Sequence, residues 1–117
     1  MGSNHSWFWT AERLSELREL LRTIAERDEK GFYIGPIGLS SYIAENRPKL
    51  GFKLPDSQVP NGLAILVFLG VLEAKRSGRI GLGYKRRFNP DALVTGARIA
   101  EYRSWKRMRE RARIGKV

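Results

Sequence analysis

The longest apolar stretch of this 117-residue chain runs from Leu63 to Leu72. It is about half the length of a membrane-spanning helix, which needs about 20 apolar residues. A helix that is apolar nearly all round is either deeply buried or has one face against another subunit. We expect this stretch to belong to a helix that runs from Asp56 or Ser57 to about Leu69 and is either buried or paired in this way. Its inward residues are predicted to be Val59, Leu63, Leu66, Val67 and Gly70.

The first half of the chain predicts two further helices and a short strand. Thr10 can cap a helix that begins at Ala11 and continues toward a stop at Gly31. Its apolar stripe is Leu14, Leu17, Leu21 and Ile24. The aromatic and β-branched run 32–34 predicts a strand, and 39–46 predicts a short helix that Pro48 prevents from continuing. Residues 47–55, which are rich in Pro, Gly and Lys, are expected to form a loop.

The second half predicts a hairpin and a long final helix. Residues 71–76 and 82–88 are expected to pair as strands around the turn 77–79. Alternation places Lys85 and Arg87 on one face of the second strand, with Tyr84, Arg86 and Phe88 on the other, and we interpret Tyr84 and Phe88 as core residues. A helix is predicted to start at Asn89-Pro90-Asp91. Its apolar stripe would contain Leu93, Val94, Ala97, Ala100, Trp105, Met108 and Ala112.

Charge is concentrated at the C-terminal end. The chain has a net charge of +10. Residues 75–117 hold 14 Lys and Arg against 3 acidic residues, whereas residues 1–74 hold 8 against 9. Concentrated positive charge repels itself and is typical of proteins that bind a polyanion, most often nucleic acid. We expect such a partner here.

Residue content argues against an enzyme. There is no cysteine, and His5 is the single histidine, so no thiolate or histidine metal site and no His-dependent triad can be assembled. No carboxylate pair stands in an apolar context, and Gly78, Gly81 and Gly83 do not form a phosphate-binding fingerprint. We expect no metal and no cofactor. No secretion signal or membrane span is predicted, and the expected location is the cytoplasm, at the nucleoid.

The order of these elements resembles the winged helix-turn-helix superfamily over residues 10–88. The segments that carry the resemblance are Leu39-Ser40-Ser41-Tyr42-Ile43-Ala44-Glu45 and Leu69-Gly70-Val71-Leu72-Glu73. The resemblance implies a mainly α fold with a small antiparallel β wing. In that superfamily the N-terminal residues of the recognition helix meet base edges, here Ser57, Gln58 and Asn61. The wing would bring Lys75, Arg76, Arg79, Lys85 and Arg87 to phosphates or a minor groove.

Two segments lie outside the resemblance. Residues 1–9 form an N-terminal arm, in which Trp7-Phe8-Trp9 is interpreted as a clasp over the core or a subunit interface. Residues 89–117 form a basic C-terminal helix, in which Arg103, Lys106, Arg109 and Arg113 are predicted to contact DNA. This helix either dimerises or folds back on the helix that begins at Ala11. The predicted dimer interface consists of Ile65, Phe68, Leu93, Ala97, Trp105 and Met108.

The sequence thus predicts a homodimer that binds double-stranded DNA by neutralising phosphates, most simply a transcriptional regulator. One alternative is a plasmid or viral partition or replication factor that coats DNA. A second is an RNA-binding or ribonucleoprotein component. A third is a protein-interaction adaptor in which the apolar third helix meets another protein.

Overall fold

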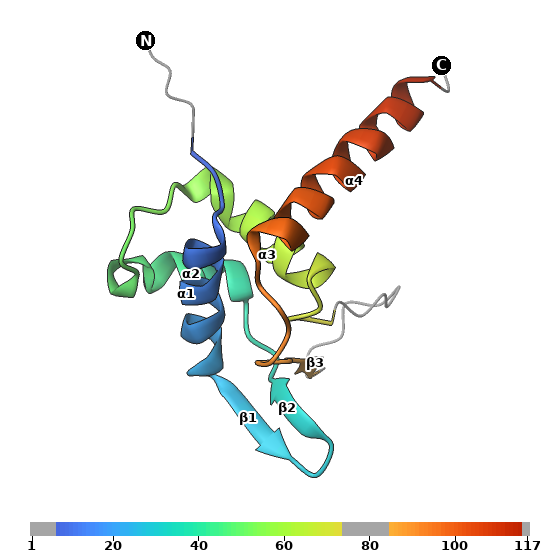
Figure 1. The fold of residues 1–117 in the computed structure, drawn as a ribbon. Coiled ribbons are helices and arrows are strands. Elements are labelled where there is room, and N and C mark those ends of the chain that lie inside the picture. Colours follow the sequence, from blue (N-terminus) through green and yellow to red (C-terminus); the bar gives the residue numbers. More distant parts are fainter. Residues whose placement is uncertain (1–6, 74–84, 116–117) are drawn as a thin grey trace.

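The computed structural model describes residues 7–73 and 85–115, with side chains up to Arg113. These residues form a mixed α+β fold of helices around one side of a small antiparallel sheet (Figure 1). The helices are α1 (Ala11–Arg22), α2 (Leu39–Glu45), α3 (Val59–Phe68) and α4 (Gly96–Gly115). The strands are β1 (Ala25–Asp28), β2 (Gly31–Ile34) and β3 (Arg86–Arg87), and short 3-10 helices span Arg47–Lys49 and Asp56–Gln58.

Helix α1 begins as predicted and ends earlier than predicted. The Thr10 hydroxyl accepts a hydrogen bond from the backbone N–H of Arg13, which caps the helix. The helix ends at Arg22, and the next residues form β1, so the predicted stop at Gly31 is wrong. Gly31 has a φ of +124° and is the first residue of β2, directly after the turn that follows β1. Because Ala and Glu are good helix formers, the helical pattern alone gave no sign of β1.

The three strands form an antiparallel sheet in the order β1-β2-β3. Leu72 forms an isolated antiparallel bridge with Phe88, and the backbone N–H of Glu73 donates to the carbonyl of Arg87. The predicted pairing of the segments around Leu72 and Phe88 is therefore confirmed where they are described. Phe88 is buried, as the alternation predicted. The turn at 77–79 and Tyr84 lie outside the described residues.

Helix α3 is the centre of the fold. It packs against the other three helices and buries Val59, Gly62, Ile65 and Leu66. Val67 and Gly70 are exposed, so their predicted inward positions are wrong, because the helical turn directs Ile65 and Leu66 to the core instead. Trp9 lies over Gly62 and is itself buried, which confirms the clasp interpretation for this member of the N-terminal arm. Trp7 packs edge-on against Trp9, with ring centroids 5.0 Å apart.

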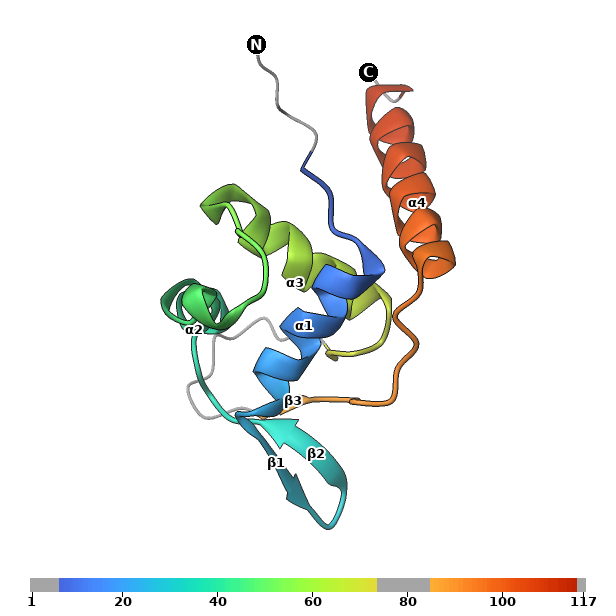
Figure 2. The ribbon, with the colours of Figure 1, turned by 60° about the vertical axis from the view of Figure 1, so that its left-hand side comes forward.

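Helix α4 starts at Gly96, seven residues later than predicted. Asn89 and Asp91 form a local turn, and the Thr95 hydroxyl accepts from the backbone N–H of Arg98 at the start of the helix. The inward face is made by Ile99 and Tyr102, which are buried, whereas Ala97 and Ala100 are exposed. Neither of these buried residues belongs to the predicted apolar stripe, so the stripe does not mark the face of α4 that packs on its own chain. In both views the C-terminal half of α4 stands clear of the other helices (Figures 1 and 2).

Candidate nucleic-acid interface

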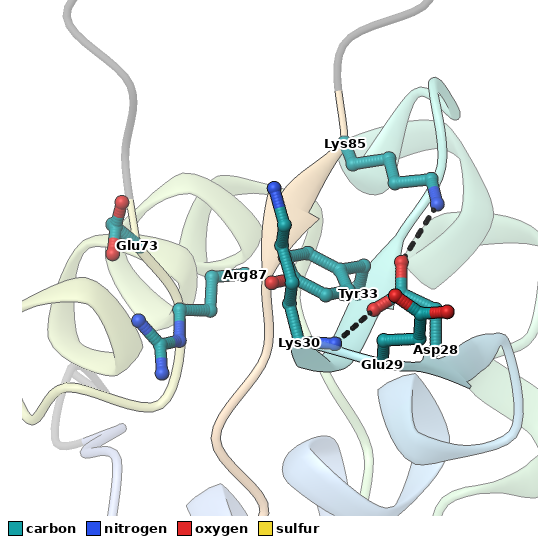
Figure 3. A pocket seen from close by; sticks show the side chains of 7 residues that line it. All are labelled: Asp28, Glu29, Lys30, Tyr33, Glu73, Lys85 and Arg87. Atoms are coloured by element: carbon teal, nitrogen blue, oxygen red, sulfur yellow. Dashed lines mark hydrogen bonds and ion pairs between the residues drawn. The ribbon is translucent and has the colours of Figure 1, made fainter.

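The first basic group lies on β3 and the residue before it. Lys85, Arg86 and Arg87 are all exposed. Lys85 and Arg87 line the same pocket of about 600 Å³, together with Tyr33, Glu73 and the β1–β2 turn (Figure 3). The shared pocket agrees with the predicted placement of Lys85 and Arg87 on one face. The Arg86 guanidinium points elsewhere and donates to the carbonyl of Ile37 at 3.3 Å.

Lys85 is paired within the chain. Its ammonium lies 3.0 Å from a carboxylate oxygen of Asp28 and 5.5 Å from the centre of the Tyr33 ring. The pKa of Asp28 is lowered, first by the hydrogen bond from the backbone N–H of Lys30 and then by the one from Lys85. Asp28 is therefore ionised at neutral pH. Exposed ion pairs are weak, so Lys85 can exchange Asp28 for another anion.

The second basic group covers the exposed part of α4. Between residues 103 and 113, six residues are Arg or Lys and one, Glu110, is acidic. All six basic residues are exposed: Arg103, Lys106, Arg107, Arg109, Arg111 and Arg113. At 1.5 Å per residue the 20-residue helix is about 30 Å long, and all of this group except Arg103 lies on its outer half. Arg107 and Arg111 were absent from the predicted contacts, although they lie one turn apart in the same basic segment.

Two arginines of this group also contact aromatic residues of their own chain. The Arg103 guanidinium donates to the carbonyl of Trp9 at 3.1 Å and lies 5.3 Å from the centre of the Phe8 ring. Arg109 lies 4.8 Å from the centre of the Trp105 ring. Arg103 thus fastens the N-terminal arm to α4. In the described part of the chain, no comparable contact is seen for Lys106, Arg107 or Arg111.

The predicted base-reading residues lie at the start of α3. Ser57 is exposed. The Asn61 amide donates to the side-chain oxygen of Gln58 at 3.1 Å, and Tyr102 of α4 donates to the Asn61 oxygen at 3.5 Å. Gln58 and Asn61 therefore take part in a network within their own chain, where α3 meets α4. Base readout by these three residues stays a prediction.

The predicted dimer residues have different environments. Ile65 is 2% exposed and belongs to the core, so its predicted interface role is wrong. The helical periodicity of α3 turns Ile65 inward together with Leu66. Phe68 packs against Tyr102 and Trp105 of the same chain, with ring centroids 5.4 and 5.5 Å apart. Ala97, Leu93, Trp105 and Met108 are exposed, the last three by 71%, 41% and 67%.

The described basic residues form two separate groups. Strand β3 lies near the β1–β2 hairpin, whereas the outer half of α4 extends to the opposite end of the molecule (Figure 1). Lys75, Arg76 and Arg79, predicted to lie in the wing, are outside the described residues. A ligand that contacts both groups must therefore be extended, as a nucleic-acid duplex is.

Comparison with protein-family profiles, curated protein sequences and solved structures found no match. None of the helices in residues 7–73 and 85–115 has the length and apolar character needed to cross a membrane. The same residues contain no cluster of three His, Cys, Asp or Glu side chains suited to hold a metal ion.

Proposed function

We propose that this chain is a winged-helix protein that binds double-stranded DNA through phosphate neutralisation at the nucleoid and regulates transcription. The observation that carries the proposal is the exposed, basic outer half of α4, where five cationic side chains lie on a projecting helix. The DNA backbone carries one negative charge per about 1.7 Å of helix axis. A cationic helix along this backbone, or in the major groove, makes several phosphate contacts at once.

The strand pairing supports the winged-helix part of the proposal. Helices α2 and α3 are followed by the Leu72–Phe88 bridge, and β3 joins β2 in the sheet. A wing in the superfamily is a hairpin between two such strands. Lys85 and Arg87 at its described end are exposed and suit phosphate contacts.

The chemistry of α3 favours a second candidate, a factor that coats plasmid or viral DNA for partition or replication. The segment from Val59 to Phe68 contains no charged residue, and Asn61 is its only residue with a polar side chain. Base edges are read by hydrogen-bonding side chains, so limited readout fits coating better than recognition of one operator. Both candidates share the phosphate-neutralising mechanism.

A competition experiment tests the preferred nucleic acid. A labelled DNA duplex of about 25 base pairs is bound by the chain and displaced by unlabelled duplex DNA of unrelated sequence, duplex RNA or single-stranded DNA. We expect unrelated duplex DNA to compete within a few-fold of the labelled sequence, and the other two to compete less well. Stronger competition by duplex RNA would instead support an RNA-binding component. Absence of binding to all three would contradict the proposal and favour an adaptor.

A further inference from the structure

Helix α3 carries a second apolar stripe on the side that faces away from the core. Pro60, Leu63, Ala64 and Val67 have the i, i+3, i+4, i+7 spacing that places residues on one helical face. Pro60 and Ala64 are exposed, Val67 is 40% exposed and Leu63 is half-buried. The inward face of the same helix is already filled by the core. Leu63 packs partly against the core, whereas Pro60, Ala64 and Val67 leave an apolar surface exposed on the described part of the chain.

The outer stripe borders a groove of about 370 Å³ between α2 and α3. Leu63 and Val67 line one wall, and Ser40 and Ser41 lie on the α2 side. Glu73 and Arg86 also line the groove and bring one charge of each sign. This surface therefore consists of an uncharged helix with one acidic side chain, Glu73, and one basic side chain, Arg86, beside it.

We propose that this face is the contact between two copies of the chain, with α3 packed against its symmetry mate. A two-fold contact uses the same patch on both subunits, so the patch must be self-complementary. Two copies of a chain with a net charge of +10 repel each other, and an uncharged helix is where this repulsion is least. Across the two-fold axis, Glu73 of one copy can meet Arg86 of the other.

Other features agree with a second copy at this face. Ala64 lies in the middle of the outer stripe, and its small side chain lets two helices approach closely. DNA is a poor occupant, since phosphates and base edges need cations and hydrogen-bonding groups that the stripe lacks. Pairing through α4, as expected from the sequence, would bring two strongly basic helices together. This inference does not depend on nucleic-acid binding.

Disulfide trapping tests the interface directly, because the chain has no cysteine of its own. Ala64→Cys places one thiol at the centre of the proposed contact, and Ala97→Cys and Met108→Cys place one at exposed positions on α4. A disulfide requires Cα atoms within about 7 Å. We expect mild oxidation at micromolar concentration to cross-link Ala64→Cys to covalent dimers and to leave Ala97→Cys monomeric. Cross-linking of Met108→Cys without Ala64→Cys would overturn the proposal in favour of α4.

Mass measurements with charge variants test whether the contact lies between chains. The parent chain is expected to have the dimer mass in sedimentation, and Val67→Asp the monomer mass with an unchanged circular dichroism spectrum. Glu73→Arg and Arg86→Glu should each weaken dimerisation. An equimolar mixture of these two variants should restore it, since only then do opposite charges meet across the axis. A monomeric parent chain, or a mixture that stays monomeric, would overturn the proposal.

Discussion

Replacing Gly62 by alanine is expected to destabilise the fold by about 2 kcal/mol. The added Cβ would lie 2.8 Å from Cε2 of Trp9, closer than real Cβ atoms approach ring carbons. The ring cannot easily retreat, because its Nε1–H donates to the carbonyl of Gln58 and Phe52 packs against it with centroids 5.8 Å apart. Overpacking costs about 1–3 kcal/mol, and the fixed ring places this change at the upper end. Alanine recovers about 1 kcal/mol of helix propensity, which leaves a loss of about 2 kcal/mol. Thermal melting should show a midpoint lower by roughly 10 °C.

Gly96→Ala is the matched control for Gly62→Ala. Gly96 lies in the first turn of α4, as Gly62 lies in the first turn of α3, but an added Cβ at Gly96 meets nothing within 4 Å. Its melting midpoint should equal that of the parent or exceed it. Adding Trp9→Leu to Gly62→Ala should cost less than the two single changes together, because the smaller side chain removes the clash. Equal midpoints for Gly62→Ala and Gly96→Ala would show that Trp9 does not hold α3 in this way.

Neutralising three cations of α4 is expected to weaken duplex DNA binding about a hundredfold at 0.15 M salt. The changes are Lys106→Gln, Arg107→Gln and Arg111→Gln, at exposed positions on the outer half of the helix. Glutamine is a good helix former, so the helix should persist. Each lost phosphate contact removes a salt slope of about 0.9, which corresponds to about fivefold in affinity at this salt concentration. Fluorescence anisotropy with a labelled duplex measures the loss.

The matched control removes the same net charge from another surface. Arg22, Lys49 and Lys53 are exposed and belong to neither α4 nor β3. Changing these three residues to glutamine should reduce affinity by less than about tenfold, since only the long-range field changes. If both triple variants lose the same affinity, net charge alone governs binding and α4 is not the contact surface.

Local signals predicted much of the fold. Thr10 capped α1, the aromatic run 32–34 formed β2, and Pro48 limited α2, because caps, strand residues and prolines act within a few positions. The misses were β1 and the start of α4. Residues 25–28 gain their strand hydrogen bonds from β2, a tertiary contact that helix propensity does not reveal. Similarly, the burial of Ile99 and Tyr102 on the body decides which face of α4 turns inward.

The sequence predicted where the basic residues of the candidate site lie in the chain, but not what their side chains contact. Composition alone located the basic residues at the C-terminal end. The sequence did not show which residues these cations contact. Lys85 pairs with Asp28, which is 57 residues away in the sequence, and Arg103 donates to the carbonyl of Trp9, which is 94 residues away. The uncharged outer face of α3 was visible in the sequence. The sequence did not show which residues of α3 face outward and which face the core, because that assignment depends on the burial of Ile65.

The salt dependence of duplex DNA binding tests the central claim most directly. The dissociation constant of the parent chain is measured between about 50 and 300 mM salt with one labelled duplex. If the basic groups of β3 and α4 together neutralise about six phosphates, the slope of log affinity against log salt should be roughly −5. An affinity that does not change over this range would contradict phosphate neutralisation as the basis of binding.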